Sequence, residues 1–155
     1  MDQGTKFRTA RGYELAAGEL KNLTASMEDY LEMIFRLEKG GPVRTSTLAD
    51  ALSVNRSSVT KMVKKMAARD LLEARPYGEI MFTPRGMLVG KYLYERHQFL
   101  TEFLKMIGVT ENILQEVEGI EHNLSQNKLM CIKKLVSFAR KHPDWWSEFT
   151  AESRK

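Results

Sequence analysis

The spacing of apolar residues between positions 48 and 69 restricts the fold more than any other feature of the chain. It predicts a short helix over 48–52, a break at Ser53-Val54-Asn55, and a second helix that ends near Arg69. Val59, Val63 and Met66 share one face of the second helix, at spacings of four and three residues. Two short helices joined by such a turn must cross closely, with small and branched side chains between them.

A β-hairpin is predicted directly after the second helix. Its strands are 71–75 and 80–83, and Pro76-Tyr77-Gly78-Glu79 between them is typical of a turn. Helix, sharp turn, helix and hairpin, in this order, are the elements of a winged helix-turn-helix. The sequence therefore predicts this fold for the first half of the chain.

The rest of the chain is predicted to be helical. One helix precedes the pair, from 27 to 39, with Ser26 as its cap. After the hairpin, Thr83-Pro84 begins a long helix that ends near Ile107. Thr110 caps a helix to about 124, and a last helix covers 128–141.

These expectations give a mainly α protein in three parts. They are a poorly ordered N-terminal arm over residues 1–22, a winged helix-turn-helix domain over 23–90, and an all-α domain over 91–155. The tryptophans of the tail, Trp145 and Trp146, are expected to pack on the last part. Cys131, the only cysteine, excludes an internal disulfide and is expected to be a buried small hydrophobe.

Composition and charge exclude some classes of protein and favour others. No apolar run approaches the roughly 18 residues of a membrane span, and residues 1–23 contain no apolar stretch typical of a secretory signal. We therefore expect a cytoplasmic protein with no membrane partner. Between Lys39 and Arg69 there are seven basic residues and one acid, Asp50. Such a patch attracts polyanions, although a solvated basic surface that binds nothing is the alternative.

The basic residues of the predicted motif are candidates for contacts with double-stranded DNA. Those near the start of the second helix are best placed for base edges: Arg56, Ser57 and Lys61. Others are better placed for phosphates: Arg44, Thr60, Lys64 and Lys65. Arg75 and Tyr77, at the tip of the hairpin, are candidates for the adjacent groove or backbone.

A second set of residues has the spacing of a metal site. Glu118, Glu121 and His122 are separated by three and four positions, so they converge on one helix face. Glu121 falls at the edge of the apolar stripe, where a carboxylate is costly unless something pairs with it. A divalent cation relieves this cost and the repulsion between the two glutamates. A solvated acidic face is the alternative.

Three further residues are candidate ligands. Asp29 and Glu32, also three apart, flank the apolar stripe of the first predicted helix. Asp29 has a structural alternative, because Ser26 and Asp29 match a capping box. His97 lies at the edge of the apolar face of the long helix, where a histidine is more often packed than a ligand.

At this point the chain resembles the DtxR/MntR metalloregulators, and specifically their manganese-type repressors. The likeness covers about residues 23–141. Its most specific strings are Ser26-Met27-Glu28-Asp29-Tyr30, Ser57-Ser58-Val59-Thr60-Lys61-Met62-Val63, Arg96-His97 and Val117-Glu118-Gly119-Ile120-Glu121-His122.

The resemblance implies that the all-α part is a metal-binding and dimerisation domain. The two-metal site of the family falls on Asp29, Glu32, His97, Glu118, Glu121 and His122. It further implies a homodimer, a (pseudo)palindromic operator, repression of metal (manganese) uptake genes and no small organic ligand. The iron-type branch has methionine at the position of Asp29 and cysteine at that of Glu118. Oxygen donors at both positions favour Mn²⁺, with two ions per subunit, and leave Fe²⁺ or another divalent metal as an alternative.

Three other functions remain open from the sequence. The first is an iron-dependent regulator of the same family. The second is a two-metal hydrolase, although no further motif supplies a substrate pocket or a free acid or base. The third is a winged-helix regulator that responds to a small molecule, in which the acidic cluster is structural. A DNA-binding repressor, and not an enzyme, is the prediction.

Overall fold

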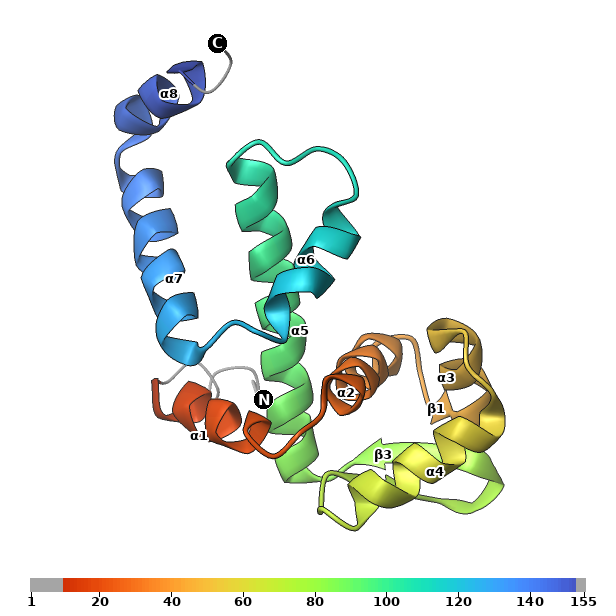
Figure 1. Cartoon of the computed structure of the whole chain (residues 1–155). Coiled ribbons are helices and arrows are strands. Elements are labelled where there is room, and N and C mark those ends of the chain that lie inside the picture. The colour runs from red at the N-terminus through yellow and green to blue at the C-terminus, as the bar shows by residue number, and fades with distance from the viewer. Residues whose placement is uncertain (1–9, 153–155) are drawn as a thin grey trace. The chain divides into compact units, whose positions relative to one another are not determined.

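The computed structural model describes residues 10–152. The chain divides into two units, and the division falls between Glu95 and Arg96, inside the long helix α5 (Pro84–Met106). Eight α-helices and one small sheet make up the described residues, so the mainly α class is confirmed (Figure 1). No helix in the described part is long and apolar enough to cross a membrane.

The first unit contains the predicted pair of crossing helices. α2 (Ala25–Glu38) precedes α3 (Thr45–Leu52), and α4 (Arg56–Ala67) follows after the predicted three-residue break. Ser53 closes α3 in the left-handed conformation, with φ 54°. This residue turns the chain sharply enough for α4 to cross α3, and the inner face of α4 is the predicted one: Val59, Val63 and Met66 are all buried.

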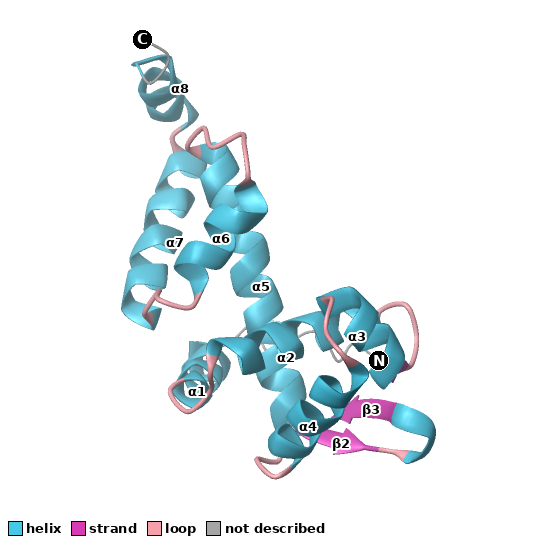
Figure 2. Cartoon of the chain, turned by 45° about the vertical axis from the view of Figure 1, so that its right-hand side comes forward, coloured by secondary structure: helices cyan, strands magenta, loops and turns pink. Residues whose placement is uncertain are grey.

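The sheet has three antiparallel strands in the order β1-β3-β2. β2 (Leu72–Ala74) and β3 (Glu79–Phe82) form the predicted hairpin, in which Leu72 lies opposite Phe82. The two-residue strand β1 (Val43–Arg44) pairs with the other side of β3 and was not predicted, because two residues are too few to show alternation. Figure 2 shows the hairpin β2–β3 extending beside α4.

A short 3₁₀ turn, η1 (Pro76–Gly78), forms the tip of the hairpin. Tyr77 has φ 61°, and its side chain is 94% exposed. A left-handed conformation is uncommon for a residue of this size. The hairpin therefore presents an aromatic ring to solvent at its tip.

The core of this unit requires close packing around the start of α5. Met27, Leu31, Leu48 and Met66 are fully buried. A Cβ at Gly86 of α5 would lie 1.7 Å from the carbonyl oxygen of Leu71, and a Cβ at Gly90 would lie 2.7 Å from the ring of Phe82. Only glycine allows α5 to approach the sheet this closely.

A helix that the sequence did not predict precedes these elements. α1 (Ala10–Leu20) occupies part of the expected arm, and residues 1–9 lie outside the described part. Ala16 is buried, and Glu19 forms an ion pair with Arg85 at the start of α5. The hydrogen bond and the charge of Glu19 raise the pKa of the Arg85 guanidinium. The glycines at positions 12 and 18 concealed this helix from pattern analysis.

The second unit contains the last part of α5 with α6 (Ile113–Glu121), α7 (Gln126–Lys141) and α8 (Pro143–Glu152). Its core includes Leu100, Val117, Leu129 and Val136. Figure 1 shows α6 and α7 beside this part of α5. The unit is entirely helical, as predicted.

Two local predictions in this unit were wrong, and a third was incomplete. The helix expected to begin after Thr110 begins at Ile113, because Asn112 adopts a left-handed conformation before it. Cys131 is exposed, because it lies on the outer face of α7. The tail forms the helix α8, which was not predicted; its Trp145 packs edge-on against Phe138 of α7, with ring centroids 5.4 Å apart, and stays 40% exposed. Pro143 at the first helical position and Asp144 in the first turn are the signals that were overlooked.

Candidate metal site and DNA-binding face

The face of α4 opposite its buried stripe is polar and fully available to a partner. All nine predicted DNA contacts have exposed side chains in the first unit: Arg44, Arg56, Ser57, Thr60, Lys61, Lys64, Lys65, Arg75 and Tyr77. The exposure of the α4 side chains follows from the helix period, because Val59, Val63 and Met66 occupy the buried face and the charged residues lie on the other side of the helix. The motif therefore presents cations on the helix that such folds insert into the major groove.

Two of these side chains already have contacts within the protein. The hydroxyl of Thr60 donates a hydrogen bond to the carbonyl oxygen of Arg56, at 3.1 Å. Arg75 forms an ion pair with Glu73 on the neighbouring strand, at 3.3 Å. Thr60 must give up its bond before it can donate to a phosphate, so the lysines of α4 are the better phosphate donors.

The second unit buries a carboxylate next to an imidazole. Glu121, the last residue of α6, is 2% exposed, and His97 on α5 is 6% exposed. Nδ1 of His97 lies 3.1 Å from Oε2 of Glu121. The sequence placed Glu121 at the edge of the apolar stripe, and the structure buries it. A carboxylate at this depth needs a partner, and here His97 is one.

His122 lies next to this pair, whereas Glu118 is in no candidate group of ligands among the described residues. Nε2 of His122 is 3.9 Å from the other carboxylate oxygen of Glu121, and its side chain is 20% exposed. Glu118 is exposed on α6 and belongs to no group of three ligating side chains among the residues that the structure describes. Glu121 therefore contacts or neighbours two of the other predicted ligands in this unit, His97 and His122, and no such contact is shown for Glu118.

The two predicted ligands of the first unit lie on α2. Asp29 is exposed, and Glu32 is half-buried and forms an ion pair with Arg36 one turn later, at 2.5 Å. The cap of α2 is Thr24, whose hydroxyl accepts from the backbone nitrogen of Met27 at 3.3 Å. Ser26 is therefore not the cap, and Asp29 lies in the second turn. The capping-box alternative for Asp29 is thus excluded.

Arg36 is a residue of this region that sequence reasoning missed. It occupies the position four residues after Glu32, a spacing at which opposite charges meet on a helix. That spacing was visible in the sequence. Its guanidinium holds the Glu32 carboxylate and competes with any cation that would bind there.

The donor set suits a hard or borderline divalent cation. Carboxylate oxygens and imidazole nitrogens are the ligands that proteins offer to Mn²⁺, Fe²⁺ and Zn²⁺, and no sulfur ligand is among the six candidates. The buried contact between His97 and Glu121 provides one of each. The residues present therefore fit a divalent metal.

Two family models match consecutive parts of the chain. Residues 22–80 match the N-terminal DNA-binding domain of the iron-dependent repressors, and residues 83–146 match their metal-binding and dimerisation domain. The chain belongs to the iron-dependent repressor family. It is a metal-dependent transcriptional repressor of the DtxR type, and not an enzyme.

Curated relatives include regulators from two bacteria. The HTH-type transcriptional regulator MntR of Listeria welshimeri is 47% identical over 123 residues, which are 78% of this chain and 87% of that protein. The protein of the same name from Geobacillus kaustophilus is 48% identical over 117 residues, which are 74% of this chain and 83% of that protein. The predicted resemblance to manganese-type members of the iron-dependent repressor family is therefore confirmed.

Solved structures of this family share the fold. The manganese regulator SloR is 28% identical with a TM-score of 0.64, and the match covers 75% of this chain and 55% of that one. ScaR with bound Zn²⁺ is also 28% identical, with a TM-score of 0.62, and the match covers 72% of this chain and 54% of that one. This chain thus spans just over half the length of these two proteins.

Proposed function

We propose that this member of the family is a Mn²⁺-responsive repressor that binds a (pseudo)palindromic operator as a homodimer and controls metal uptake genes in the cytoplasm. The observation that carries the proposal is the buried carboxylate of Glu121 in contact with His97. This contact places one carboxylate and one imidazole, which are both ligands of divalent cations, next to each other on α5 and α6. The names of the MntR relatives and of the manganese regulator SloR support the choice of metal.

Six side chains would hold two ions per subunit. His97, Glu118, Glu121 and His122 would contribute from α5 and α6, and Asp29 and Glu32 from α2. Glu118 is exposed and Glu32 is paired with Arg36, so both side chains must change their contacts when they bind. The bound ions would supply positive charge that stabilises these carboxylates together.

The oxygen-rich donor set favours Mn²⁺ over metals that prefer sulfur, with Fe²⁺ as the alternative. Asp29 is the residue that tests this choice. Asp29→Met replaces an oxygen donor with a thioether, and we expect the variant to respond relatively more to Fe²⁺. An unchanged ratio of Mn²⁺ to Fe²⁺ activation, measured by operator binding, would contradict the assignment.

Operator recognition would use the exposed face of α4. Arg56, Ser57 and Lys61 would read base edges, and Lys64 and Lys65, with Arg44 and Thr60, would contact phosphates. Arg75 and Tyr77 would extend the contact from the hairpin tip. In a dimer, two such helices must enter successive major grooves about 34–36 Å apart.

Metal and DNA would be coupled because the ligands come from both units. Side chains of α2 that share ions with side chains of α5 and α6 restrict how the DNA-binding unit is oriented in a dimer. A restricted orientation lowers the conformational entropy lost on operator binding. By linkage, operator binding must then tighten metal binding by the same factor.

The test is operator binding measured in parallel with Mn²⁺, Fe²⁺, Zn²⁺ and a chelator. The proposal expects tight binding with Mn²⁺ and weak binding with the chelator, and the order of the three metals defines the selectivity. The same operator affinity in chelator and in Mn²⁺ would refute the metal switch.

A further inference from the structure

The tip of the β2–β3 hairpin presents an aromatic side chain to solvent in a constrained backbone conformation. Tyr77 is 94% exposed and has φ 61°, and Gly78 next to it has φ 75°. A tyrosine adopts this left-handed conformation only where its surroundings hold it there. Arg75, the one basic residue of the hairpin, is already paired with Glu73. Tyr77 is therefore the main group that the tip offers to a partner.

The surroundings that hold the tip come from β1 and the start of α3. β1 pairs with β3 on the side opposite to β2, and its last pair joins Arg44 to Glu79. One residue further along, the hydroxyl of Thr45 donates a hydrogen bond to the carbonyl oxygen of Gly78, at 3.2 Å. We call this hydrogen bond the tether. It continues the attachment of the two segments by one position, up to the tip itself.

The hydroxyl of Thr45 serves the hairpin and not the cap of its own helix. Thr45 is the first residue of α3, and the cap residue Arg44 makes no side-chain hydrogen bond to the helix start. Hydroxyls at helix starts commonly accept from a backbone N–H of the first turn. Here the hydroxyl donates across to the hairpin, and a Cβ at Gly78 would lie only 3.4 Å from its oxygen. The start of α3 and the hairpin tip are thus in direct contact.

We propose that Thr45 is a positioning residue for DNA binding: the tether holds the hairpin tip against the start of α3, so that Tyr77 meets a phosphate of the DNA backbone in one fixed orientation. The tyrosine hydroxyl is a neutral donor of the kind that contacts phosphate oxygens. A tip that is held before binding loses little conformational freedom on binding, which strengthens the complex. The proposal rests on the proposed function for the contact between hairpin and DNA, and it adds the residue that makes this contact rigid.

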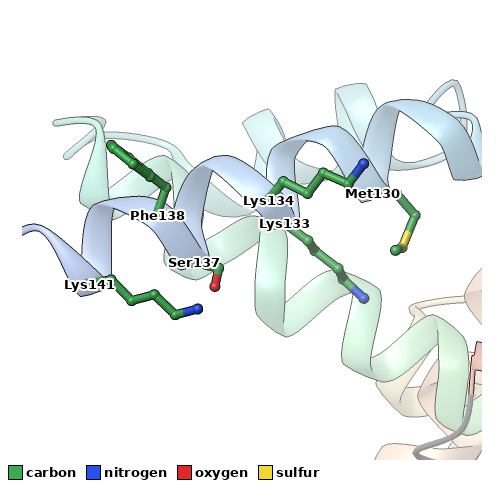
Figure 3. A pocket seen from close by; sticks show the side chains of 6 residues that line it. All are labelled: Met130, Lys133, Lys134, Ser137, Phe138 and Lys141. Carbon is green, nitrogen blue, oxygen red and sulfur yellow. The ribbon is translucent and has the colours of Figure 1, made fainter.

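A second basic surface of the chain is a less suitable place for this contact. α7 has a hollow of about 360 Å³ with Lys133, Lys134 and Lys141 along it (Figure 3). These lysines lie in the part that matches the metal-binding and dimerisation domain. Thr45 and Tyr77 lie in the part that matches the DNA-binding domain. The phosphate contact is therefore assigned to the hairpin.

The tether is measured first in the full-length protein without DNA. Chymotrypsin cleaves after Tyr77 when the tip opens, and the cleavage rate follows the population of the open form. Thr45→Val keeps the shape of the side chain and removes the hydroxyl, so we expect cleavage to be about five-fold faster, the factor for one typical hydrogen bond. Thr45→Ser keeps the hydroxyl and should be cleaved at the wild-type rate. Mass spectrometry identifies the fragment that ends at Tyr77.

The role in DNA binding is measured by a double-mutant cycle on the full-length protein with Mn²⁺. The probe is the duplex that the wild type with Mn²⁺ selects from a pool of random sequences. For each subunit, we expect Tyr77→Ala to weaken binding about ten-fold, as for a hydrogen bond to a charged group, and Thr45→Val about five-fold. In the Tyr77→Ala background, Thr45→Val should change the affinity less than about two-fold, because the group that it positions is absent.

The salt dependence of binding separates positioning from general damage to the fold. Tyr77 carries no positive charge and releases no counterion. Tyr77→Ala and Thr45→Val should therefore leave unchanged the slope of the logarithm of affinity against the logarithm of salt concentration. A substitution that misplaces α4 would instead remove lysine contacts and lower this slope.

The outcomes distinguish this proposal from the proposed function. Wild-type cleavage of Thr45→Val, additive losses of affinity in the double variant, or a lowered salt slope in Thr45→Val would each overturn the positioning role. A wild type whose affinity for the duplex ignores Mn²⁺, while the cycle gives the expected result, would overturn the metal switch and leave the positioning role supported. A wild type that selects no duplex would overturn both.

Discussion

Replacing Glu121 with glutamine should separate the metal response from the stability of the fold. The substitution removes one charge and keeps the shape, and the amide oxygen can still accept from the imidazole of His97. Glu121 is only 2% exposed, so water does not replace the lost ligand. Removing one partner of a buried charged contact costs about 2–5 kcal/mol of binding free energy. A loss of about 2.8 kcal/mol, within this range, would weaken Mn²⁺ binding about 100-fold.

Without metal, the substitution Glu121→Gln should not lower the stability of the fold. In the metal-free protein, Glu121 is a buried carboxylate whose desolvation is costly, and glutamine removes that charge while its amide oxygen can keep the contact with His97, so no buried group is left without a partner. We therefore expect the metal-free Glu121→Gln protein to unfold at the same or a higher temperature than the metal-free wild type. A merely structural role for Glu121 would give the opposite result, since the variant would be less stable in both conditions.

Thermal unfolding with and without Mn²⁺ measures both effects. At a Mn²⁺ concentration about 100 times the wild-type dissociation constant, binding stabilises the wild type by about 2.7 kcal/mol, and a 100-fold weaker site by about 0.4 kcal/mol. For a chain of this size these values correspond to shifts of roughly 5–11 °C and 1–2 °C. Glu116→Gln, at an exposed position of the same helix, is the control and should behave as wild type. Equal Mn²⁺-induced shifts in Glu121→Gln and wild type would refute the reasoning.

Three further predictions follow from the two units. Lys61→Ala should make operator binding less selective for base sequence. Lys64→Ala should weaken binding to all DNA sequences and lower, by about one, the slope of the logarithm of DNA affinity against the logarithm of salt concentration. Equal losses of sequence preference in competition assays would contradict the assignment of Lys61 to bases and Lys64 to phosphates. Arg36→Gln removes the cation that pairs with Glu32, so calorimetry should show Mn²⁺ binding up to about five-fold tighter. Weaker Mn²⁺ binding would count against Glu32 as a ligand. Gly86→Ala places a Cβ 1.7 Å from a backbone carbonyl oxygen and should lower the free energy of unfolding, measured in urea, by at least about 1–3 kcal/mol. Gly18→Ala has open space around it and should raise the free energy of unfolding slightly. Equal stabilities of the two variants would show that the backbone near Gly86 relaxes at no cost.

The sequence was sufficient for the DNA-binding unit because its signals are local. The break at Ser53-Val54-Asn55 separates α3 from α4 as predicted, and the face of α4 that contains Val59 is buried as its period requires. Proline and glycine placed the turn of the hairpin correctly. Each of these features depends on neighbours within a few residues, which pattern analysis can evaluate.

Features that depend on distant partners were not predictable. The helix α1 is stabilised by Glu19 meeting Arg85, which is 66 positions away in the chain. Cys131 looked apolar between Met130 and Ile132, yet it lies on the outer side of α7, because helix register and not composition determines burial. No local pattern specifies which face of a helix a remote element will cover.

The candidate metal site shows both situations. Glu121 and His122 are neighbours in the chain, as the last residue and the C-cap of α6, and the burial of Glu121 follows from the apolar stripe beside it. The contact between Glu121 and His97 joins residues 24 positions apart and was implied only by the family resemblance. The exposure of Glu118 was not expected, because helical spacing groups it with Glu121 without fixing the depth of either.

The claim that one set of side chains links metal to operator is tested most directly by measuring the linkage in both directions. Operator affinity is determined by fluorescence anisotropy at saturating Mn²⁺ and in chelator, and Mn²⁺ affinity is determined by calorimetry with and without operator. We predict that each ligand tightens the other by the same factor, about 5- to 150-fold. Operator binding that is equally tight in chelator, together with Mn²⁺ binding that operator leaves unchanged, would contradict the account.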